Sequence, residues 1–128
     1  MPLSLTAHRL RKHADFQRVY KAGRKQFSKQ IGYFHALRSE QTQLNSATLG
    51  PRIGLTVPKA LGKAVDRNRI KRRMREAVRH ALPLLSAPVD LVLHPRRSVL
   101  ALEFTQLERE VAQIFRTVQT ACDRAAQP

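Results

Sequence analysis

One stretch decides the fold: RIGLTVPKALGKAVDRNRIKRRMREAVRHAL, residues 52–82. Its first six residues alternate apolar side chains with small or polar ones, which is typical of a half-buried strand. Pro58 ends that strand, and from Val65 onward the apolar residues recur with helical spacing until Pro83. The stretch therefore predicts a strand followed by a helix. The apolar side of the strand holds Ile53, Leu55 and Val57.

The predicted helix has one thin apolar stripe and cations on both flanks. At about 100° per residue, its apolar side chains fall within about 60° of one another, with Val78 at one edge. Residues 67–79 hold seven Lys or Arg and a single acid, Glu76. A solvated helix ordinarily mixes the two signs of charge, so this crowding indicates a polyanionic partner. The stripe consists of Ile70, Met74, Ala77 and Ala81.

The whole chain is short and strongly basic. Its 128 residues suggest one domain, residues 1–128, with residues 1–8 and 122–128 expected to be loose. Lys and Arg number 24 against 9 Asp and Glu, a net charge of +15. Such a balance indicates nucleic acid rather than a membrane surface, because the apolar stripe of the helix is needed by the sheet and lacks Trp and Phe.

The remaining segments predict an α+β domain. A helix over residues 9–22 is expected to be capped by Asp15 and to end at Gly23, and residues 38–50 suggest a hairpin loop. Thr105 and Glu108 have capping-box spacing before a final helix to about Ala121. The fold class is a mixed four-stranded sheet packed by three helices, in the order αβββαβα. The other strands are expected at residues 25–28, 31–37 and 89–93, the last interrupted by Pro95.

Several classes of protein are disfavoured. The lone Cys122 allows no internal disulfide and no cysteine-based zinc site, and the five histidines are scattered. No glycine-rich phosphate loop, transmembrane run or secretory signal is visible, which predicts a cytoplasmic protein. No carboxylate or histidine pair suggests a nuclease site, so we expect neither a catalytic residue nor a metal ligand in the protein.

The aromatic residues are few and unevenly placed. Five of the seven lie within residues 16–34, interleaved with cations. Single-stranded nucleic acids bind to such aromatic platforms beside basic grooves. Tyr33 and Phe34 are neighbours in a predicted strand and face opposite sides, so one can serve the core and the other a ligand. Phe104 and Phe115 are expected in the core.

Five segments together resemble the bacterial ribonuclease P protein subunit. The stretch GKAVDRNRIKRRMRE, residues 62–76, looks like the family signature, and it follows the strand IGLTV, residues 53–57. The run LRKHADFQRVYKAG, residues 10–23, is similar to the first helix of the family. Residues 89–93 and the closing helix also fit, so the resemblance covers about residues 9–120. The sequence departs from the family pattern at Gly32, which leaves a gap in the strand face that is expected to contact the leader.

The resemblance implies a function and a set of RNA contacts. The family protein joins a catalytic RNA, which holds the active site and its Mg²⁺ ions, and together they remove the 5′ leader from precursor tRNA. The resemblance also implies a left-handed βαβ crossover. The sequence gives no evidence of an obligate protein partner. With the two flanks of the helix, the resemblance assigns the leader cleft to Phe16, Tyr20, Phe34, Asn68, Lys71 and Arg75. It assigns contact with the catalytic RNA to Arg69 and Arg73, with Arg67 and Arg72 at the margins of that contact.

Two other functions remain open at this point. A ribosomal protein or an RNA chaperone is also small and basic, and recovery with one large RNA would separate these from a ribonuclease P subunit. An autonomous nuclease would need converging carboxylates or a histidine pair, and Asp15, Asp66, Glu76 and Asp90 are scattered in the sequence.

Overall fold

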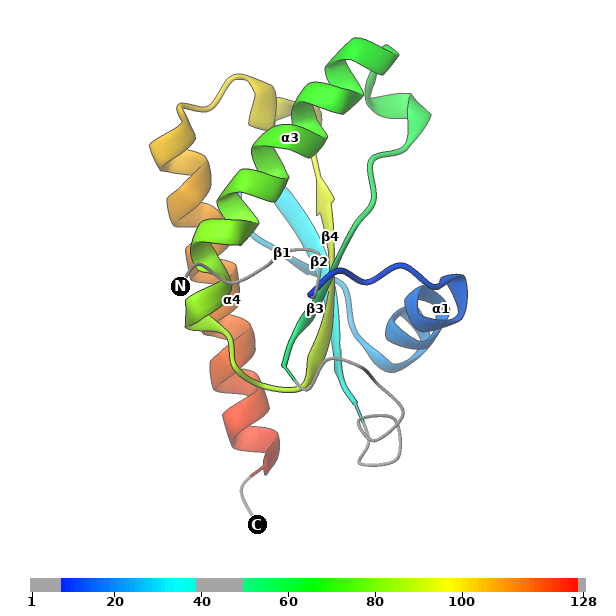
Figure 1. The fold of residues 1–128 in the computed structure, drawn as a ribbon, viewed down its shortest axis with the longest axis vertical. Coiled ribbons are helices and arrows are strands. Elements are labelled where there is room, and N and C mark those ends of the chain that lie inside the picture. Colours follow the sequence, from blue (N-terminus) through cyan, green and yellow to red (C-terminus); the bar gives the residue numbers. More distant parts are fainter. Residues whose placement is uncertain (1–7, 39–49, 127–128) are drawn as a thin grey trace.

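Three helices and a four-stranded sheet make up the fold, as the sequence predicts. The structure is a computed structural model, and it describes residues 8–38 and 50–126. Helix α1 covers one face of the sheet, and helices α3 and α4 cover the other (Figure 1). Short 3₁₀ helices span Lys59–Leu61, Leu82–Leu84 and Arg97–Leu100. The main elements are α1 (His13–Ala22), β1 (Gln26–Phe27), β2 (Ile31–Leu37), β3 (Arg52–Leu55), α3 (Ala64–Ala81), β4 (Val89–Pro95) and α4 (Phe104–Ala126).

The strand order is β1-β2-β4-β3. Strand β4 pairs antiparallel with β2 and parallel with β3, so it lies between them. The expectation of a hairpin joining β2 and β3 is therefore wrong, although the loop itself, residues 39–49, lies outside the described residues. The cause is long-range, because β4 arrives from beyond α3 and occupies the place beside β2. The handedness of the β3–α3–β4 crossover stays a prediction.

The larger core fills the space between the sheet and helices α3 and α4. The predicted apolar stripe of α3 is buried there, and Val78 at its edge is buried with it. Helix α4 contributes Phe115, which is fully buried, while Phe104 packs at the margin. Strand β2 sends Tyr33 into this core and Phe34 to the other face, which confirms the expected alternation.

Two helix starts differ from the expected ones. Helix α1 begins at His13 with Lys12 at its N-cap, so Asp15 lies inside the first turn and does not cap the helix. The Asp15 carboxylate instead faces Arg18 and Arg52. Helix α4 begins at Phe104, before the predicted box. The backbone N–H of Glu103 donates to Gln106 Oε1 at 3.2 Å. The capping contact therefore joins residues 103 and 106, two positions before the predicted pair Thr105 and Glu108.

Two chain segments are more regular than expected. Helix α4 continues to Ala126 rather than ending near Ala121, so residues 122–126 are not loose. The reason is that Cys122 still packs against the core. Pro95 ends β4 rather than interrupting it, and it pairs with Ile31 across the sheet. Residues 1–7 and 127–128, also expected to be loose, lie outside the described residues.

Helix α1 approaches the sheet closely at Gly54. A Cβ built at this position would lie 2.7 Å from Phe16 Cζ and 3.2 Å from Leu10 Cδ2. The first distance is shorter than real Cβ contacts and the second is tight, so the absence of a side chain lets the Phe16 ring lie on β3. A smaller core under α1 holds Leu10, Val19 and Val92, with Phe16 and Phe34 partly buried beside it.

Candidate nucleic-acid interface

A cationic cleft runs between the segment that leads into α1, strand β3 and helix α3. Its volume is about 630 Å³. Leu55, Met74 and Leu93 contribute to an apolar floor, and Phe16 lines it from α1. The described residues that line the cleft include no Asp or Glu. Its surface can therefore attract phosphate and still offer apolar contact to a base. The lining cations are Arg9, Arg11, Lys71 and Arg75.

Only some of the residues assigned to a leader cleft line this space. Phe16, Lys71 and Arg75 do so, from helices α1 and α3. Asn68 is exposed three residues before Lys71, outside the described lining of the cleft. Tyr20 and Phe34 lie behind Phe16 on the α1 face of the sheet rather than in the cleft wall.

Aromatic rings form a continuous row away from the cleft. The Phe16 and Tyr20 centroids lie 6.5 Å apart, and those of Tyr20 and Phe34 lie 5.0 Å apart in an edge-to-face arrangement. His94 contacts both, at 5.7 Å from Tyr20 and 5.6 Å from Phe34. All four are partly buried, so they present edges and faces to a neighbouring ligand while remaining fixed by packing.

The surroundings of His94, which contacts Tyr20 and Phe34 in this row, favour its neutral form. Burial lowers the pKa of His94 below its ordinary value of 6.5, and the charge of Lys25 lowers the pKa further. The Tyr20 hydroxyl lies 3.2 Å from His94 Nε2 and 3.4 Å from Thr56 Oγ1. These contacts fix the Tyr20 ring between α1 and the sheet.

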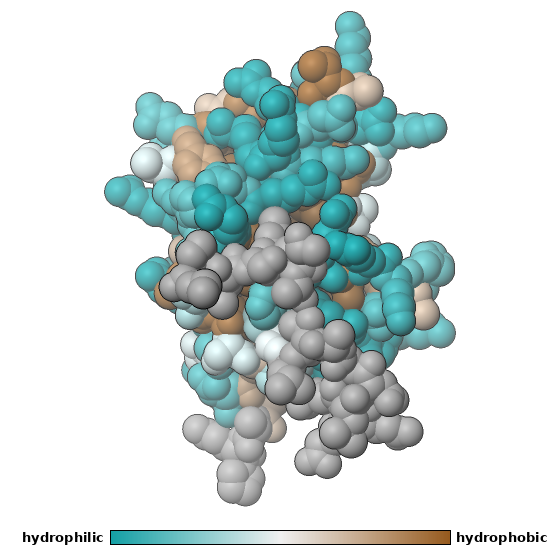
Figure 2. Space-filling model, viewed as in Figure 1, coloured by the Kyte–Doolittle hydropathy of each residue, from teal (hydrophilic) through white to brown (hydrophobic). Residues whose placement is uncertain are grey.

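The opposite flank of α3 forms a second, shallower hollow. It measures about 340 Å³ and lies beside the start of α4, where Phe104 forms part of its wall. Figure 2 shows hydrophilic side chains covering the surface over α3. The two flanks distinguished on the helical wheel thus open into two separate hollows. The cations of the second hollow are Arg69, Arg72 and Arg73, with Glu76 beside them.

Two cations of α3 also make contacts within the protein. Arg73 donates from Nη2 to the Leu102 carbonyl, and its Nε is buried with no partner among the described residues. Arg73 therefore helps to hold α3 against the approach to α4. Arg67 donates from Nε to the Gly62 carbonyl at 3.2 Å and lies at the N-terminal end of the helix. Arg67 is not among the described residues that line the cleft or the second hollow.

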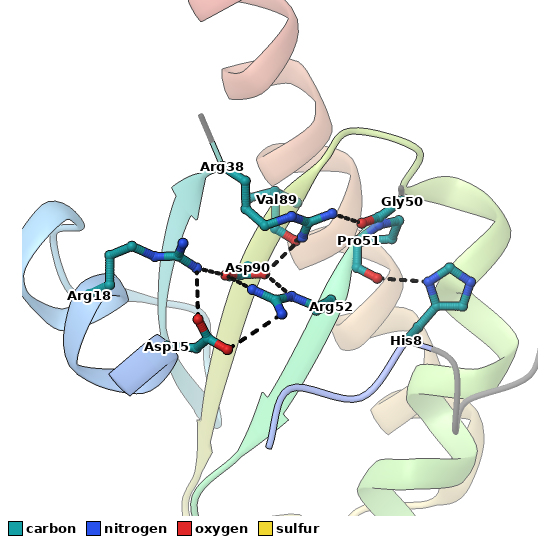
Figure 3. Close-up of polar contacts among 9 residues, drawn as sticks. All are labelled: His8, Asp15, Arg18, Arg38, Gly50, Pro51, Arg52, Val89 and Asp90. Carbon is teal, nitrogen blue, oxygen red and sulfur yellow. Dashed lines mark hydrogen bonds and ion pairs between the residues drawn. The ribbon is translucent and has the colours of Figure 1, made fainter. Parts of the chain in front are cut away.

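A buried ionic cluster anchors α1 to the sheet (Figure 3). The Asp90 carboxylate is fully buried. It accepts hydrogen bonds from Arg38 Nη1 at 2.8 Å, from Arg52 Nε and Nη2 at 2.8 Å each, and from Arg18 Nη2. Asp15 adds ion pairs of 3.5 Å to Arg18 and 3.4 Å to Arg52. Charges from α1, β3, β4 and the end of β2 thus meet at one point.

The pKa values of two arginines of this cluster shift in opposite directions. Burial lowers the pKa of Arg38, and the hydrogen bond to Asp90 opposes that change. The hydrogen bond to Asp90 raises the pKa of Arg52, which is nearer the surface. Both guanidinium groups remain charged at neutral pH. The cluster therefore depends on the Asp90 charge, which accepts hydrogen bonds from three arginines.

Sequence reasoning missed Arg9, Arg11 and the Asp90 cluster. Asp90 is the one charge in the otherwise apolar run of residues 89–93, and a charge in a buried strand signals a partner. Arg9 and Arg11 precede the expected aromatic helix and carry no spacing signal of their own. They enter the cleft because Leu10 between them packs into the small core and bonds to Ile53 of β3.

Residues 8–38 and 50–126 show neither a metal-binding cluster nor a membrane-spanning helix. These residues include no group of three or more His, Cys, Asp or Glu that could hold a metal ion. The helices among them are too short or too polar to cross a membrane.

Comparison with known proteins assigns the chain and its fold to a family. The family model described as Ribonuclease P matches residues 5–119. A ribonuclease P protein component from Exiguobacterium sp. is 36% identical over 109 residues, covering 85% of this chain and 88% of the relative. The same component from Bacillus velezensis is 34% identical, with 85% and 87% covered.

Solved structures agree. A Staphylococcus aureus RNase P protein mutant with defective mRNA degradation activity matches with a TM-score of 0.72 and 28% identity, over 88% of this chain and 89% of that one. The RNase P protein from Thermotoga maritima shares the fold with a TM-score of 0.70 at 22% identity, over 85% and 96%.

The described structure is thus a small, basic α+β protein with cationic hollows on both sides of one helix. The chain belongs to the ribonuclease P protein family. Proteins of this family are components of a tRNA-processing ribonuclease whose other component is an RNA subunit.

Proposed function

We propose that this chain is the RNA-binding subunit of ribonuclease P, which binds the catalytic RNA and the 5′ leader of precursor tRNA at the same time. It thereby promotes endonucleolytic 5′ maturation of tRNA in the cytoplasm. The observation that carries the proposal is the pair of cationic hollows on the two sides of α3. One helix with cations on both sides can contact two RNA molecules.

The cleft beside α1 suits the single-stranded leader. Four cations surround an apolar floor, and Phe16 begins a row of aromatic side chains. Unpaired bases stack on such side chains, whereas paired bases are already stacked on one another. Tyr20 and Phe34 lie further along this row, and the exposed Asn68 precedes Lys71 by three residues on α3. The leader-facing set is then Phe16, Tyr20, Phe34, Asn68, Lys71 and Arg75.

The hollow on the other flank suits a structured RNA. Arg69 and Arg72 are exposed there, and each guanidinium group can form bidentate hydrogen bonds with a phosphate. Arg73 contributes charge while it holds the helix in place. Arg67, near the start of the helix, extends the same cationic edge. We assign Arg67, Arg69, Arg72 and Arg73 to the catalytic RNA.

The chemistry of cleavage belongs to the RNA in this proposal. RNA-held Mg²⁺ ions supply the catalysis, and the protein supplies binding and orientation. A ribosomal protein or an RNA chaperone also needs basic surfaces, but the family match over residues 5–119 favours the ribonuclease P assignment. We therefore expect the chain without its RNA subunit to leave precursor tRNA uncleaved.

Paired variants of α3 test the division between its two flanks. Lys71→Ala with Arg75→Ala removes two cleft cations, and Arg69→Ala with Arg72→Ala removes two cations of the opposite hollow. Arg72 replaces Arg73 as the second target because truncating Arg73 would also break its bond to Leu102. Both affinities are measured for both variants: that of the protein for the RNA subunit, and that of the assembled enzyme for precursor tRNA.

We expect the cleft variant to weaken precursor tRNA binding by about tenfold while assembly stays near normal, because two charge-assisted contacts are lost. The opposite variant should weaken assembly with the RNA subunit by a similar factor. An identical pattern of losses in the two variants would show that α3 is one undivided basic surface, and the division would be rejected.

A further inference from the structure

Phe27 is an unusually exposed aromatic side chain. It lies on the two-residue edge strand β1, and 59% of its surface is open to solvent. The two other large apolar side chains exposed within the described residues, Leu37 and Val65, are aliphatic. The packing of the fold does not require a ring at this edge position. Phe27 is therefore a candidate contact for a partner.

Two cations flank the Phe27 ring. Lys25 Nζ lies 5.2 Å from the ring centroid, and Arg96 Cζ lies 5.7 Å from it. These cations come from different parts of the chain, one before β1 and one directly after β4. We call Lys25, Phe27 and Arg96 the Phe27 platform. Its combination of one aromatic face and two positive charges complements an unpaired base with its adjoining phosphates.

The sheet register places this platform in line with the aromatic row. Phe27 lies directly opposite Gly32, and Gly32 lies directly opposite His94. Residues opposite one another in antiparallel strands point to the same face. Phe34, two residues from Gly32, shares that face as well, about 6.6 Å further along β2. The platform thus extends the row from Phe16 through Tyr20 and Phe34.

Gly32 leaves the space that Lys25 and Phe27 of the platform occupy. A Cβ at this position would lie 3.1 Å from Lys25 Cε and 3.5 Å from Phe27 Cε1. The missing side chain of β2 therefore leaves a space over which Lys25 and Phe27 lie. The gap that glycine makes in this strand face is covered by the Phe27 ring from β1 and by Lys25, which precedes that strand.

We infer that the Phe27 platform is a stacking subsite for one unpaired base of the leader strand, beyond the bases that contact Phe16, Tyr20 and Phe34. This inference rests on the proposed function. An entering base takes a face of the Phe27 ring, and the displaced cation turns to the phosphate beside that base. An apolar protein surface is a poorer occupant, because it would bury Lys25 and Arg96 without neutralising them.

Leader length provides the test. The assembled enzyme is titrated with precursor tRNAs whose leaders grow by one nucleotide at a time, using the wild type and Phe27→Ala. Loss of one base stack should weaken binding about fivefold or more, but only for leaders long enough to reach the platform. Phe27→Tyr keeps a ring and should retain the affinity. Leu37→Ala, an equivalent truncation of an exposed side chain at the far end of β2, is the matched control.

A fluorescent base analogue locates the contact. Placed at successive leader positions, 2-aminopurine should be quenched at one distal position in the wild type and released there by Phe27→Ala, with nearer positions unchanged. Circular dichroism and thermal unfolding check that each variant is folded.

The possible failures can be told apart. If wild-type affinity does not depend on the leader at any length, the proposed function fails. If the wild type is leader-dependent but Phe27→Ala matches Leu37→Ala for every leader, the platform inference alone is overturned. An equal loss for mature tRNA, or a loss of self-association in Phe27→Ala, would also overturn it, because the platform would then contact another partner.

Discussion

Replacing Asp90 by asparagine tests the ionic anchor that joins α1 to the sheet. The change keeps the size and shape of the side chain but removes its charge. Asp90 and Arg38 both have side chains that are 0% exposed, so water cannot replace the lost partner of the guanidinium. Arg18 and Arg52 each keep an ion pair with Asp15. Arg38 keeps hydrogen bonds to the Val89 and Gly50 carbonyls, so the loss centres on the buried Asp90 carboxylate itself.

The cost follows from that burial. Removing one partner of a buried ion pair typically destabilises a protein by about 3–5 kcal/mol. The asparagine oxygen can still accept one or two of the present hydrogen bonds, which places the expected loss near the lower end, about 3 kcal/mol. For a chain of this size, the loss corresponds to a fall of roughly 10 °C in melting temperature.

Thermal and urea unfolding, followed by far-ultraviolet circular dichroism, measure this loss. Asp15→Asn is the matched control, because it makes the same chemical change in the same cluster at a more exposed position. Its ion pairs are long, so its removal should cost less than about 1 kcal/mol. If Asp90→Asn melts no lower than Asp15→Asn, the buried charge does not anchor α1, and the reasoning is refuted.

Three further outcomes are expected. Gly54→Ala should displace the Phe16 ring, destabilise the fold by about 1–3 kcal/mol and reduce leader-dependent affinity, as unfolding and binding assays can show. Burial lowers the pKa of both His35 and His94 below 6.5, so the unfolded chain takes up protons at a higher pH than the folded one. Stability should therefore fall as the pH drops below 6.5 through the lower folded pKa values, and a His35→Gln, His94→Gln variant should show a shallower fall in melting temperature. Finally, log affinity for single-stranded RNA should fall with log salt by about 0.7 per phosphate contact, and a flat titration would contradict the electrostatic account.

Local patterns in the sequence predict much of this fold. The two faces of the strand predicted from residue 52 onward appear in the structure, because Ile53, Leu55 and Val57 face the larger core and Gly54 faces Phe16. The apolar stripe of α3 appears as well, since it depends on neighbours in sequence. The same wheel separates Lys71 and Arg75 from Arg69 and Arg73, and the structure places these pairs on two different hollows. Side-chain direction along a helix follows directly from its geometry.

Features that depend on distant residues could not be predicted in this way. The insertion of β4 between β2 and β3 is a choice among sheet orders, and no local pattern encodes that choice. Asp15 has the residue type of a helix cap, yet Arg52, which is far away in sequence, holds it in an ion pair. Arg73 has the pattern of a free surface cation, but the Leu102 carbonyl binds it. In each case the deciding contact joins segments whose proximity only the fold creates.

The affinity of precursor and mature tRNA, measured for the RNA subunit with and without this protein, tests the central claim most directly. The account predicts that adding the protein strengthens binding of precursor tRNA far more than binding of mature tRNA, because only the precursor carries a leader for the cleft. An equal strengthening of both, or none of either, would contradict the claim that this chain holds the leader.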